Sequence, residues 1–213
     1  MRRAFSLVEI LVVIAIIIVL TAIMFSILAK SRESGHEAAC TTHLHQLAMA
    51  AAMYEQDHDG KLSSNLFSDV RSLNPYVKSS DIWYCKQDPF PKGANAQASR
   101  WFGGKVSYFP PVTILPGFME ALSSRDDNPG VFACLVHGQR LSQGAVPASA
   151  YAGYEGLVLT VRRDGAVSRR RPKERCYSDQ SRGRLWWDFF TDADPPPAVV
   201  AELTAGGSVV PCK

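Results

Sequence analysis

The feature that most constrains this chain is an unbroken apolar run near its N-terminus. From Leu7 to Leu28 the only polar residues are Glu9, Thr21 and Ser26. A helix of that length spans roughly 33 Å at 1.5 Å per residue, which matches a bilayer core of about 30 Å. The run therefore predicts a transmembrane helix.

The charges that flank the run predict its orientation. Arg2 and Arg3 precede it and Lys30 follows it. The positive-inside tendency places the arginine end in the cytoplasm, so we expect the remainder of the chain to lie outside. An oxidising compartment favours disulfides, and all five cysteines lie beyond the run: Cys40, Cys85, Cys134, Cys176 and Cys212. Because their number is odd, one must stay unpaired within a monomer.

Three kinds of segment fit this run: a cleaved secretory signal, a plain signal anchor and a prepilin leader. A secretory signal has an apolar core of about 7 to 15 residues and is cut after it at a small-x-small site. The run is longer than such a core. Neither Ser26 nor Ala29 has a small residue two positions before it. We therefore expect the apolar segment to be retained.

The residues at the start of the run separate the two remaining interpretations. Ala4-Phe5-Ser6-Leu7-Val8-Glu9 resembles the processing signature of type IV pilins and type II secretion pseudopilins. In that family a short basic leader is removed on the cytoplasmic side, the new N-terminal residue is methylated, and the fifth mature residue is glutamate. The resemblance implies cleavage between Ala4 and Phe5, N-methylation of Phe5 and an assembly role for Glu9. Ala4 stands where the family usually has glycine, and the alternative is an uncleaved anchor with a chance glutamate.

The resemblance gives the charge of Glu9 a physical role. A lone charge within a membrane costs about 3 kcal/mol on insertion scales, so such residues usually pair or face protein. Cleavage before Phe5 would create an α-amino group that can meet the Glu9 carboxylate of a neighbouring subunit at low dielectric. Such a contact would favour assembly and fix the stagger between subunits. The alternative is a Glu9 that lies at headgroup level and is solvated.

The helix is expected to continue beyond the membrane to about Asp57 and to stop near Gly60, a residue suited to a C-terminal cap. Apolar and small residues recur there at three- and four-residue spacing, which predicts a stripe that packs on a folded domain: Leu44, Leu47, Ala48, Ala51 and Ala52.

Further segments are similar to a bacterial subgroup of pilin-like proteins. Residues 40–47, CTTHLHQL, and 54–60, YEQDHDG, are similar to that subgroup's pattern C-x-x-N-L-x-Q-L followed by Y-x-x-D-x-D-G, with His43 in place of Asn. Residues 74–78 and 83–89 are similar to its L-x-P-Y-V and C-P-x-D-P segment, with Lys86 in place of Pro. By that analogy Cys85 would pair with Cys40, a link worth roughly 3 to 4 kcal/mol.

The rest of the chain predicts a β-rich head. All 13 prolines lie at or after Pro75, and residues 131–136 and 157–161 are expected strands, with Asp164-Gly165 as a two-residue hairpin turn into a third. His137-Gly138 and Asp164-Gly165 resemble the subgroup's H-x9-D-G signature with a longer spacing. Residues 144–156 are expected to form a surface loop. After the proline triplet we expect one more edge strand and Cys212 as a possible partner of Cys176.

Together these patterns predict an α+β fold: a long N-terminal helix whose second half packs on a small antiparallel sheet. The expected divisions are a leader at 1–4, a transmembrane helix at 5–29, an amphipathic continuation at 30–60 and a head at 61–213.

Three patterns in the sequence could mark a chemical site. Residues 57–60 could be taken for a calcium loop, but an EF-hand would then need an acidic residue at Leu66, so we expect a polar helix end. Cys134-x-x-His137 could be half of a metal site with Cys176 as a distant third ligand, but no second close pair exists. No Ser, His and Asp grouping has a nucleophile context. We therefore expect no metal, no cofactor and no enzyme.

A basic stretch lies between residues 162 and 184, although the whole chain carries a formal charge of only +3. Its cluster of Arg169, Arg170, Arg171 and Lys173, with tryptophans nearby, could capture DNA or another anionic polymer. The favoured alternative is a solvated surface, or one that matches acidic neighbours in a filament.

The resemblance implies a structural function. The chain would be a pilin or pseudopilin of the bacterial inner membrane, cut by a prepilin peptidase and polymerised with like subunits by an assembly ATPase and a platform protein. The other interpretation is a minor pilin or anchored module whose basic head captures an anionic polymer. The sequence does not separate pilus from pseudopilus.

Overall fold

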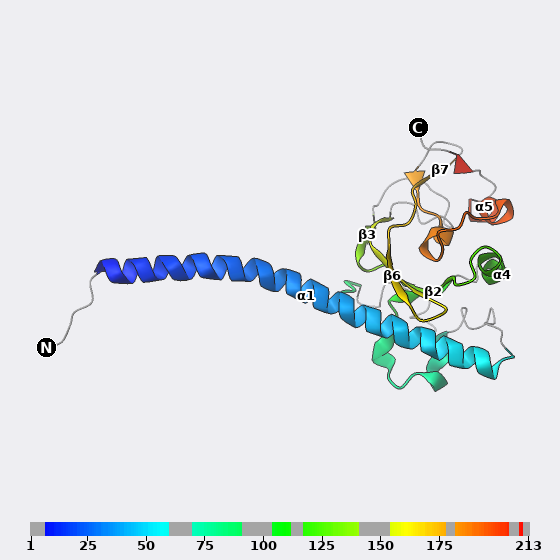
Figure 1. Ribbon diagram of the computed structural model, residues 1–213, viewed down its shortest axis with the longest axis horizontal. Coiled ribbons are helices and arrows are strands. Elements are labelled where there is room, and N and C mark those ends of the chain that lie inside the picture. Colours follow the sequence, from blue (N-terminus) through cyan, green and yellow to red (C-terminus); the bar gives the residue numbers. More distant parts are fainter. Residues whose placement is uncertain are drawn as a thin grey trace. The chain divides into compact units, whose positions relative to one another are not determined.

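The longest element of the chain is helix α1 (Leu7–Asp57). The computed structural model describes residues 7–59, 70–90, 104–111, 117–140, 154–177, 182–204 and 209–210 of the 213. The chain forms two units, residues 1–38 and residues 39–213. In the described part of the first unit only α1 is present (Figure 1).

Helix α1 runs for 51 residues without interruption, a length of roughly 77 Å. The two hydroxyls of its apolar part are satisfied within the helix: Thr21 Oγ1 donates to the carbonyl of Ile17 at 2.8 Å, and Ser26 Oγ to that of Ile23 at 2.8 Å. The helix ends at Asp57, as predicted, and Asp59 adopts a left-handed φ of 55°. Aspartate tolerates this conformation, so a residue before Gly60 already turns the chain.

The second unit contains the predicted antiparallel sheet. Its four strands have the order β1-β2-β5-β6, and all neighbours are antiparallel. Three of them, β2, β5 and β6, lie where strands were expected. The four strands are β1 (Tyr108–Phe109), β2 (Gly130–Cys134), β5 (Val158–Arg162) and β6 (Val167–Arg170). The α+β fold class predicted from the sequence is therefore confirmed.

Two smaller sheets and several short helices complete the described head. Strand β3 (Gly138–Arg140) pairs with β4 (Tyr154–Gly156), so the end of the expected loop at 144–156 is a strand; the rest of that loop lies outside the described residues. The other sheet has the order β8-β7-β9, and β9 is the predicted late edge strand. Its strands are β7 (Arg175–Tyr177), β8 (Arg182–Gly183) and β9 (Val209–Val210). The short helices are η1 (Val70–Tyr76), η2 (Ser80–Trp83), α4 (Phe118–Ser123), η3 (Trp186–Phe189) and α5 (Pro197–Leu203).

The hairpin between β5 and β6 differs in detail from the prediction. The amide of Gly165 donates to the carbonyl of Arg162, and the amide of Arg162 donates to the carbonyl of Ala166. The loop is therefore three residues long, with Gly165 at a φ of 86°. A type I turn followed by a left-handed glycine closes such loops and suits the twist of the strands. Gly165 was placed correctly, but the two-residue turn was wrong.

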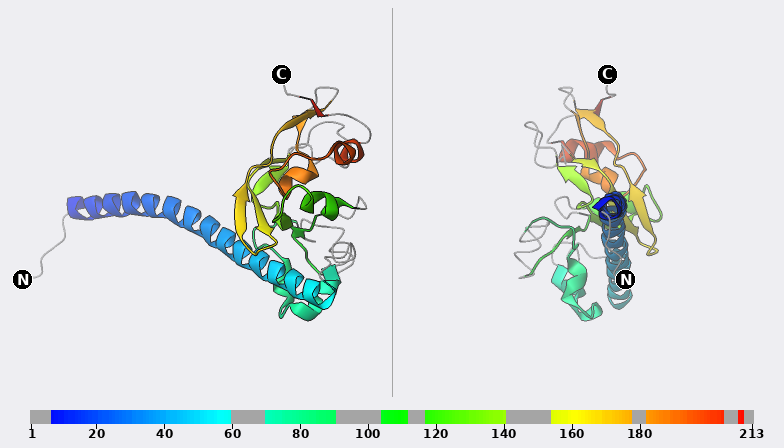
Figure 2. Two further views of the ribbon diagram at one scale, coloured as in Figure 1. Left: turned by 45° about the vertical axis from the view of Figure 1, so that its right-hand side comes forward. Right: turned by 90° about the vertical axis from the view of Figure 1, so that its left-hand side faces the viewer.

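The sheet is buried on both faces because its side chains alternate. Leu159 and Val161 of β5 join a core cluster that includes residues of α1, η1 and η2. Val158 joins a second cluster, and Thr160 Oγ1 donates to the carbonyl of Phe189 at 2.7 Å. Residues of α4, η3 and α5 belong to this second cluster, and Figure 2 shows these helices in green, orange and red beside the yellow strands.

The stripe on α1 that packs on the head is largely the predicted one. Leu44, Leu47, Ala48 and Ala51 are buried, and so are Cys40, Ala50 and Tyr54. Ala52 is exposed, which corrects one member of the predicted stripe. At 3.6 residues per turn, position 52 lies about 100° from position 51 and off the buried side.

Candidate functional site

The apolar part of α1 differs from an ordinary packed helix in its exposure. Every residue from 7 to 35 is exposed, and none of the candidate membrane span is buried. Large apolar side chains such as Leu7, Ile16 and Phe25 each expose more than half of their surface. A soluble monomer rarely shows such a continuous apolar surface. The helix is long and apolar enough to cross a membrane.

Glu9 is the acidic residue of the first turn of α1, and its side chain is exposed. The positive end of the helix dipole favours a carboxylate at this place. Its neighbours Val8 and Ile10 are exposed apolar residues. Ala4 and Phe5, the expected cleavage and methylation residues, lie outside the described residues.

A disulfide ties α1 to the segment that follows η2. Cys40 and Cys85 are bonded across a sequence separation of 45, and their Cα atoms lie 5.7 Å apart. This distance is typical of disulfides. The pairing implied by the resemblance is therefore confirmed.

Of the possible Cys176–Cys212 disulfide, only Cys176 lies among the residues that the structure describes. Cys176, at the centre of β7, takes part in a disulfide. Cys212 lies outside the described residues.

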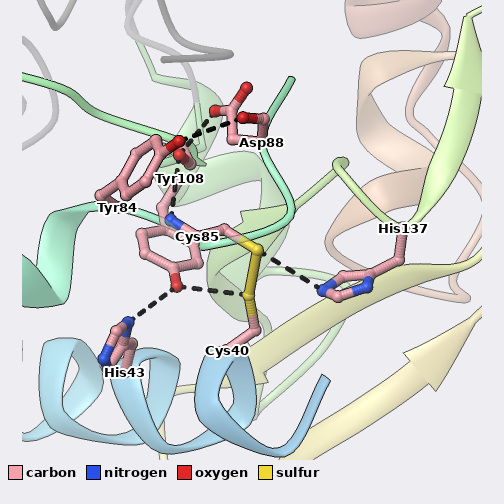
Figure 3. Close-up of a disulfide and its surroundings, with 8 residues drawn as sticks. Cys40, His43, Tyr84, Cys85, Asp88, Tyr108 and His137 are labelled. Carbon is pink, nitrogen blue, oxygen red and sulfur yellow. Dashed lines mark hydrogen bonds between the residues drawn. A yellow bond between two sulfur atoms is a disulfide. The ribbon is translucent and has the colours of Figure 1, made fainter. Parts of the chain in front are cut away.

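A buried hydrogen-bond network surrounds the Cys40–Cys85 disulfide (Figure 3). Tyr108 donates its hydroxyl hydrogen to Cys40 Sγ at 3.5 Å, and His43 Nδ1 lies 3.2 Å from the same hydroxyl. Burial raises the pKa of Tyr108, so the phenol keeps its proton and can donate. On the other side, Ser107 Oγ accepts from the amide of Cys85 at 3.0 Å. The disulfide is thus held by groups from β1 and from the segment before it.

Ser107 also anchors the segment that carries Cys85. Its hydroxyl donates to Asp88 Oδ2 at 2.6 Å, and Asp88 Oδ1 accepts from the amide of Phe90 at 2.9 Å. Asp88 is buried. Buried carboxylates need such donors because an unsatisfied one is costly. This arrangement fixes the loop from which Cys85 reaches α1.

Two further side chains meet the disulfide. His137 Nε2 lies 3.8 Å from Cys85 Sγ, and Figure 3 shows the imidazole pointing at the sulfur atoms. Cys134, at the end of β2, is a buried free thiol, and burial raises its pKa to about 12. The donor atoms of Cys40, Cys85, Cys134 and His137 all lie within 4.8 Å of one another.

The sequence predictions include all four of these residues, but they do not place them in one cluster. They pair Cys134 and His137 with Cys176, which instead takes part in a disulfide. The missing link is strand register: β1 pairs with β2 so that Tyr108 lies opposite Cys134, while the hydroxyl of Tyr108 reaches Cys40. The signal in the sequence is the Cys40–Cys85 pair, because these two cysteines are the second pair of ligands that a metal site with Cys134 and His137 needs.

The basic stretch is divided between inward and outward side chains. Arg170 is buried and ion-paired with Asp192, and burial lowers its pKa. Lys173 donates to the carbonyl of Asp192 at 2.8 Å and lies 3.6 Å from the carboxylate of Asp194. Arg169 and Arg171 are exposed. Arg170 therefore cannot offer its guanidinium to a polymer, which weakens the binding alternative.

A buried ion pair lies beside this stretch. Arg175 donates to both carboxylate oxygens of Asp188, at 2.7 and 2.6 Å. Burial raises the pKa of Asp188, and the hydrogen bond from Arg175 opposes that rise. Only 1% of the Asp188 side chain is exposed. The pair joins β7 to η3 and has a structural role.

No family model, no curated protein and no solved structure matches this chain.

Proposed function

We propose that this chain is a structural subunit of a type IV pilus or a type II secretion pseudopilus. In this role a prepilin peptidase cuts between Ala4 and Phe5, and Phe5 is N-methylated. The apolar part of α1 first holds the subunit in the inner membrane, with its N-terminus cytoplasmic and its head outside. An assembly ATPase and a platform protein then transfer it into a filament of pilin-like subunits.

The strongest support for this proposal is the contrast in exposure between the two parts of α1. Helix α1 is continuous, yet every residue from 7 to 35 is exposed while its residues beyond Ala39 contribute to the core of the head. Lipid can cover that apolar surface before assembly, and the same surface on other subunits can cover it afterwards. A filament would therefore bury it without any change of secondary structure.

Glu9 supplies the polar element of the proposed assembly. It is the only charged residue between Leu7 and Leu28, so its carboxylate has few choices of partner in an apolar environment. The α-amino group released at Phe5 would provide an opposite charge on a neighbouring subunit. A charge pair at low dielectric is strong only when its geometry is good, which would select one stagger between subunits.

N-terminal sequencing and mass spectrometry of the membrane-fraction protein test the processing step. We expect the chain to begin at a methylated Phe5. An intact Met1, or a start near Lys30, would contradict the proposal.

Substitution of Glu9 tests the assembly step. We expect Glu9→Ala to abolish incorporation into filaments, because the charge that fixes the stagger is lost, while tryptophan fluorescence shows a folded head. The matched control is Glu33→Ala, an exposed glutamate on the same helix beyond the span, which should assemble normally. Equal incorporation of both variants would argue against a role for Glu9.

A further inference from the structure

Three sulfur atoms and one imidazole nitrogen converge in the head. Cys40 comes from α1, Cys85 from the segment after η2, Cys134 from the end of β2 and His137 from the turn before β3. Their donor atoms lie within 4.8 Å of one another. Cys134 and His137 are three residues apart in the sequence, but Cys40 and Cys85 are distant from them and from each other, so the fold brings the two cysteines to this pair.

This donor set has the chemistry of a structural zinc site. Three thiolates and one imidazole form one of the common four-coordinate sets, with Zn–S near 2.3 Å and Zn–N near 2.0 Å. A tetrahedron with these bond lengths has edges of roughly 3.5 to 3.8 Å. The distance from Cys85 Sγ to His137 Nε2 is 3.8 Å. Small side-chain rotations would therefore bring the four donors to a common centre.

Two of the sulfur atoms accept hydrogen bonds from the groups around them. The amide of Val136 hydrogen-bonds to the Cys134 sulfur, and the hydroxyl of Tyr108 donates to Cys40 Sγ at 3.5 Å. Such outer hydrogen bonds orient ligands and spread their negative charge. Cys40, Cys85 and Cys134 are all buried, which keeps water from the sulfur atoms. Simple packing of a buried thiol explains Cys134 alone, but it does not explain an imidazole nitrogen directed at the sulfur atoms.

We propose that the reduced head binds one Zn²⁺ through Cys40, Cys85, Cys134 and His137, and that the Cys40–Cys85 disulfide and the zinc site are alternative states of this cluster. A dithiol reductant converts one state to the other. It gives two electrons and two protons to the disulfide, so that Cys40 and Cys85 become thiols and its own sulfurs form a disulfide. Zn²⁺ then displaces the three thiol protons, and neutral His137 binds through Nε2 with its proton on Nδ1.

Either state would hold α1 to the head. The disulfide joins Cys40 to Cys85 alone, whereas zinc would also join the end of β2 and the turn that follows it. The head would thus keep its attachment to α1 in both reducing and oxidising surroundings. This inference is independent of filament assembly.

Metal binding by the full chain in detergent tests the proposal. The protein is reduced with dithiothreitol, desalted under argon and titrated with Zn²⁺ against a chromogenic chelator; a second sample keeps its disulfides. We expect one Zn²⁺ per chain in the reduced sample and none in the oxidised one. Co²⁺ in place of Zn²⁺ should give the visible absorption of a tetrahedral site with thiolate charge-transfer bands.

Variants identify the ligands. Cys134→Ser and His137→Gln should each weaken Zn²⁺ binding by more than the 10- to 100-fold that outer partners contribute. Their matched controls are Cys176→Ser and His36→Gln, which change residues outside the cluster and should bind Zn²⁺ as the wild type does. If Cys134→Ser does not fold, the charge-transfer intensity of the wild-type Co²⁺ complex still reports the number of thiolates.

Three results would overturn the proposal. The first is a reduced wild-type chain that takes up no stoichiometric Zn²⁺. The second is unchanged affinity in His137→Gln. The third is Zn²⁺ bound at this cluster while the Cys40–Cys85 disulfide stays intact.

Discussion

The two units of this chain use apolar residues in opposite ways. In residues 7–35 every apolar side chain is exposed, whereas many large apolar side chains in the described part of the head are completely buried, among them Trp83, Phe132 and Trp187. The first unit depends on its environment to cover its surface, and the head covers its own. Helix α1 belongs to both units, so one continuous helix carries an exposed apolar segment and a segment that is packed on the head.

The largest effect is expected for a buried ion pair of the head, because the head excludes water from it. Arg175→Met should destabilise the head by about 3 to 5 kcal/mol, because it leaves the Asp188 carboxylate buried without its ionic partner. The gap from the wild type should narrow at mildly acidic pH, because a stranded Asp188 can then take up a proton. Denaturant unfolding followed by tryptophan fluorescence measures the change, since all four tryptophans lie in the head.

Arg170→Met is the matched control for that experiment. Its partner Asp192 has a side chain that is 76% exposed, so loss of Arg170 leaves a solvated carboxylate and no stranded charge. We expect a change within about 1 kcal/mol. Equal destabilisation by both variants would show that the burial of Asp188 does not set the cost.

A charge in the exposed apolar segment should weaken membrane insertion and leave the stability of the head unchanged. Ile16→Asp should cost about 3 kcal/mol of membrane insertion, because it places a carboxylate near the middle of the span. Carbonate extraction of membranes measures the fraction that is inserted. Ser34→Asp changes an exposed residue beyond the span and should insert normally. An Ile16→Asp chain that inserts as well as this control would argue against a membrane span.

The same contrast explains what could be predicted from the sequence. The apolar run, the end of α1 and the stripe at Leu44, Leu47 and Ala48 follow from local periodicity, which needs no knowledge of the rest of the chain. The strands at β2 and β5 carry enough β-branched and aromatic residues to be recognised. Short elements such as η3 and α5 have no comparable local signal, because tertiary contacts decide them.

The cysteine cluster lies beyond local reasoning for a related reason. The sequence predicts the Cys40–Cys85 link only by analogy, and it suggests Cys176 as the third ligand beside Cys134 and His137. Their meeting with Cys40 and Cys85 depends on the register of β1 on β2 and on which face of α1 is buried. Local periodicity predicts the buried face of α1, but the register of β1 on β2 cannot be obtained from spacing along the chain.

One glycine from each unit allows the same comparison, with smaller expected changes in stability. Gly165→Ala should destabilise the head by about 1 to 2 kcal/mol, because its φ of 86° is left-handed and an added Cβ would lie 3.1 Å from the ring of His45. Gly35→Ala lies in an exposed helix with nothing within 4 Å of the added atom, so helicity should rise slightly and head stability should stay unchanged. Unfolding by fluorescence and helicity by circular dichroism separate the two effects. A neutral Gly165→Ala would mean that the turn relaxes.

The smallest expected effect concerns Asp164 in the same turn. The amide of Ala166 donates to Asp164 Oδ1 at 2.8 Å and holds the pKa of this carboxyl below its usual value. A depressed folded-state pKa means that the contribution to stability is complete above the unfolded-state pKa and is lost as the pH falls through the folded-state value. Asp164→Asn should therefore be slightly less stable than the wild type at pH 7, and the difference should shrink toward about pH 3. Because the carboxylate is exposed, solvent screens it and the effect stays small. A difference in unfolding free energy that is constant across this range would show that the turn depends on the shape of the side chain and not on its charge.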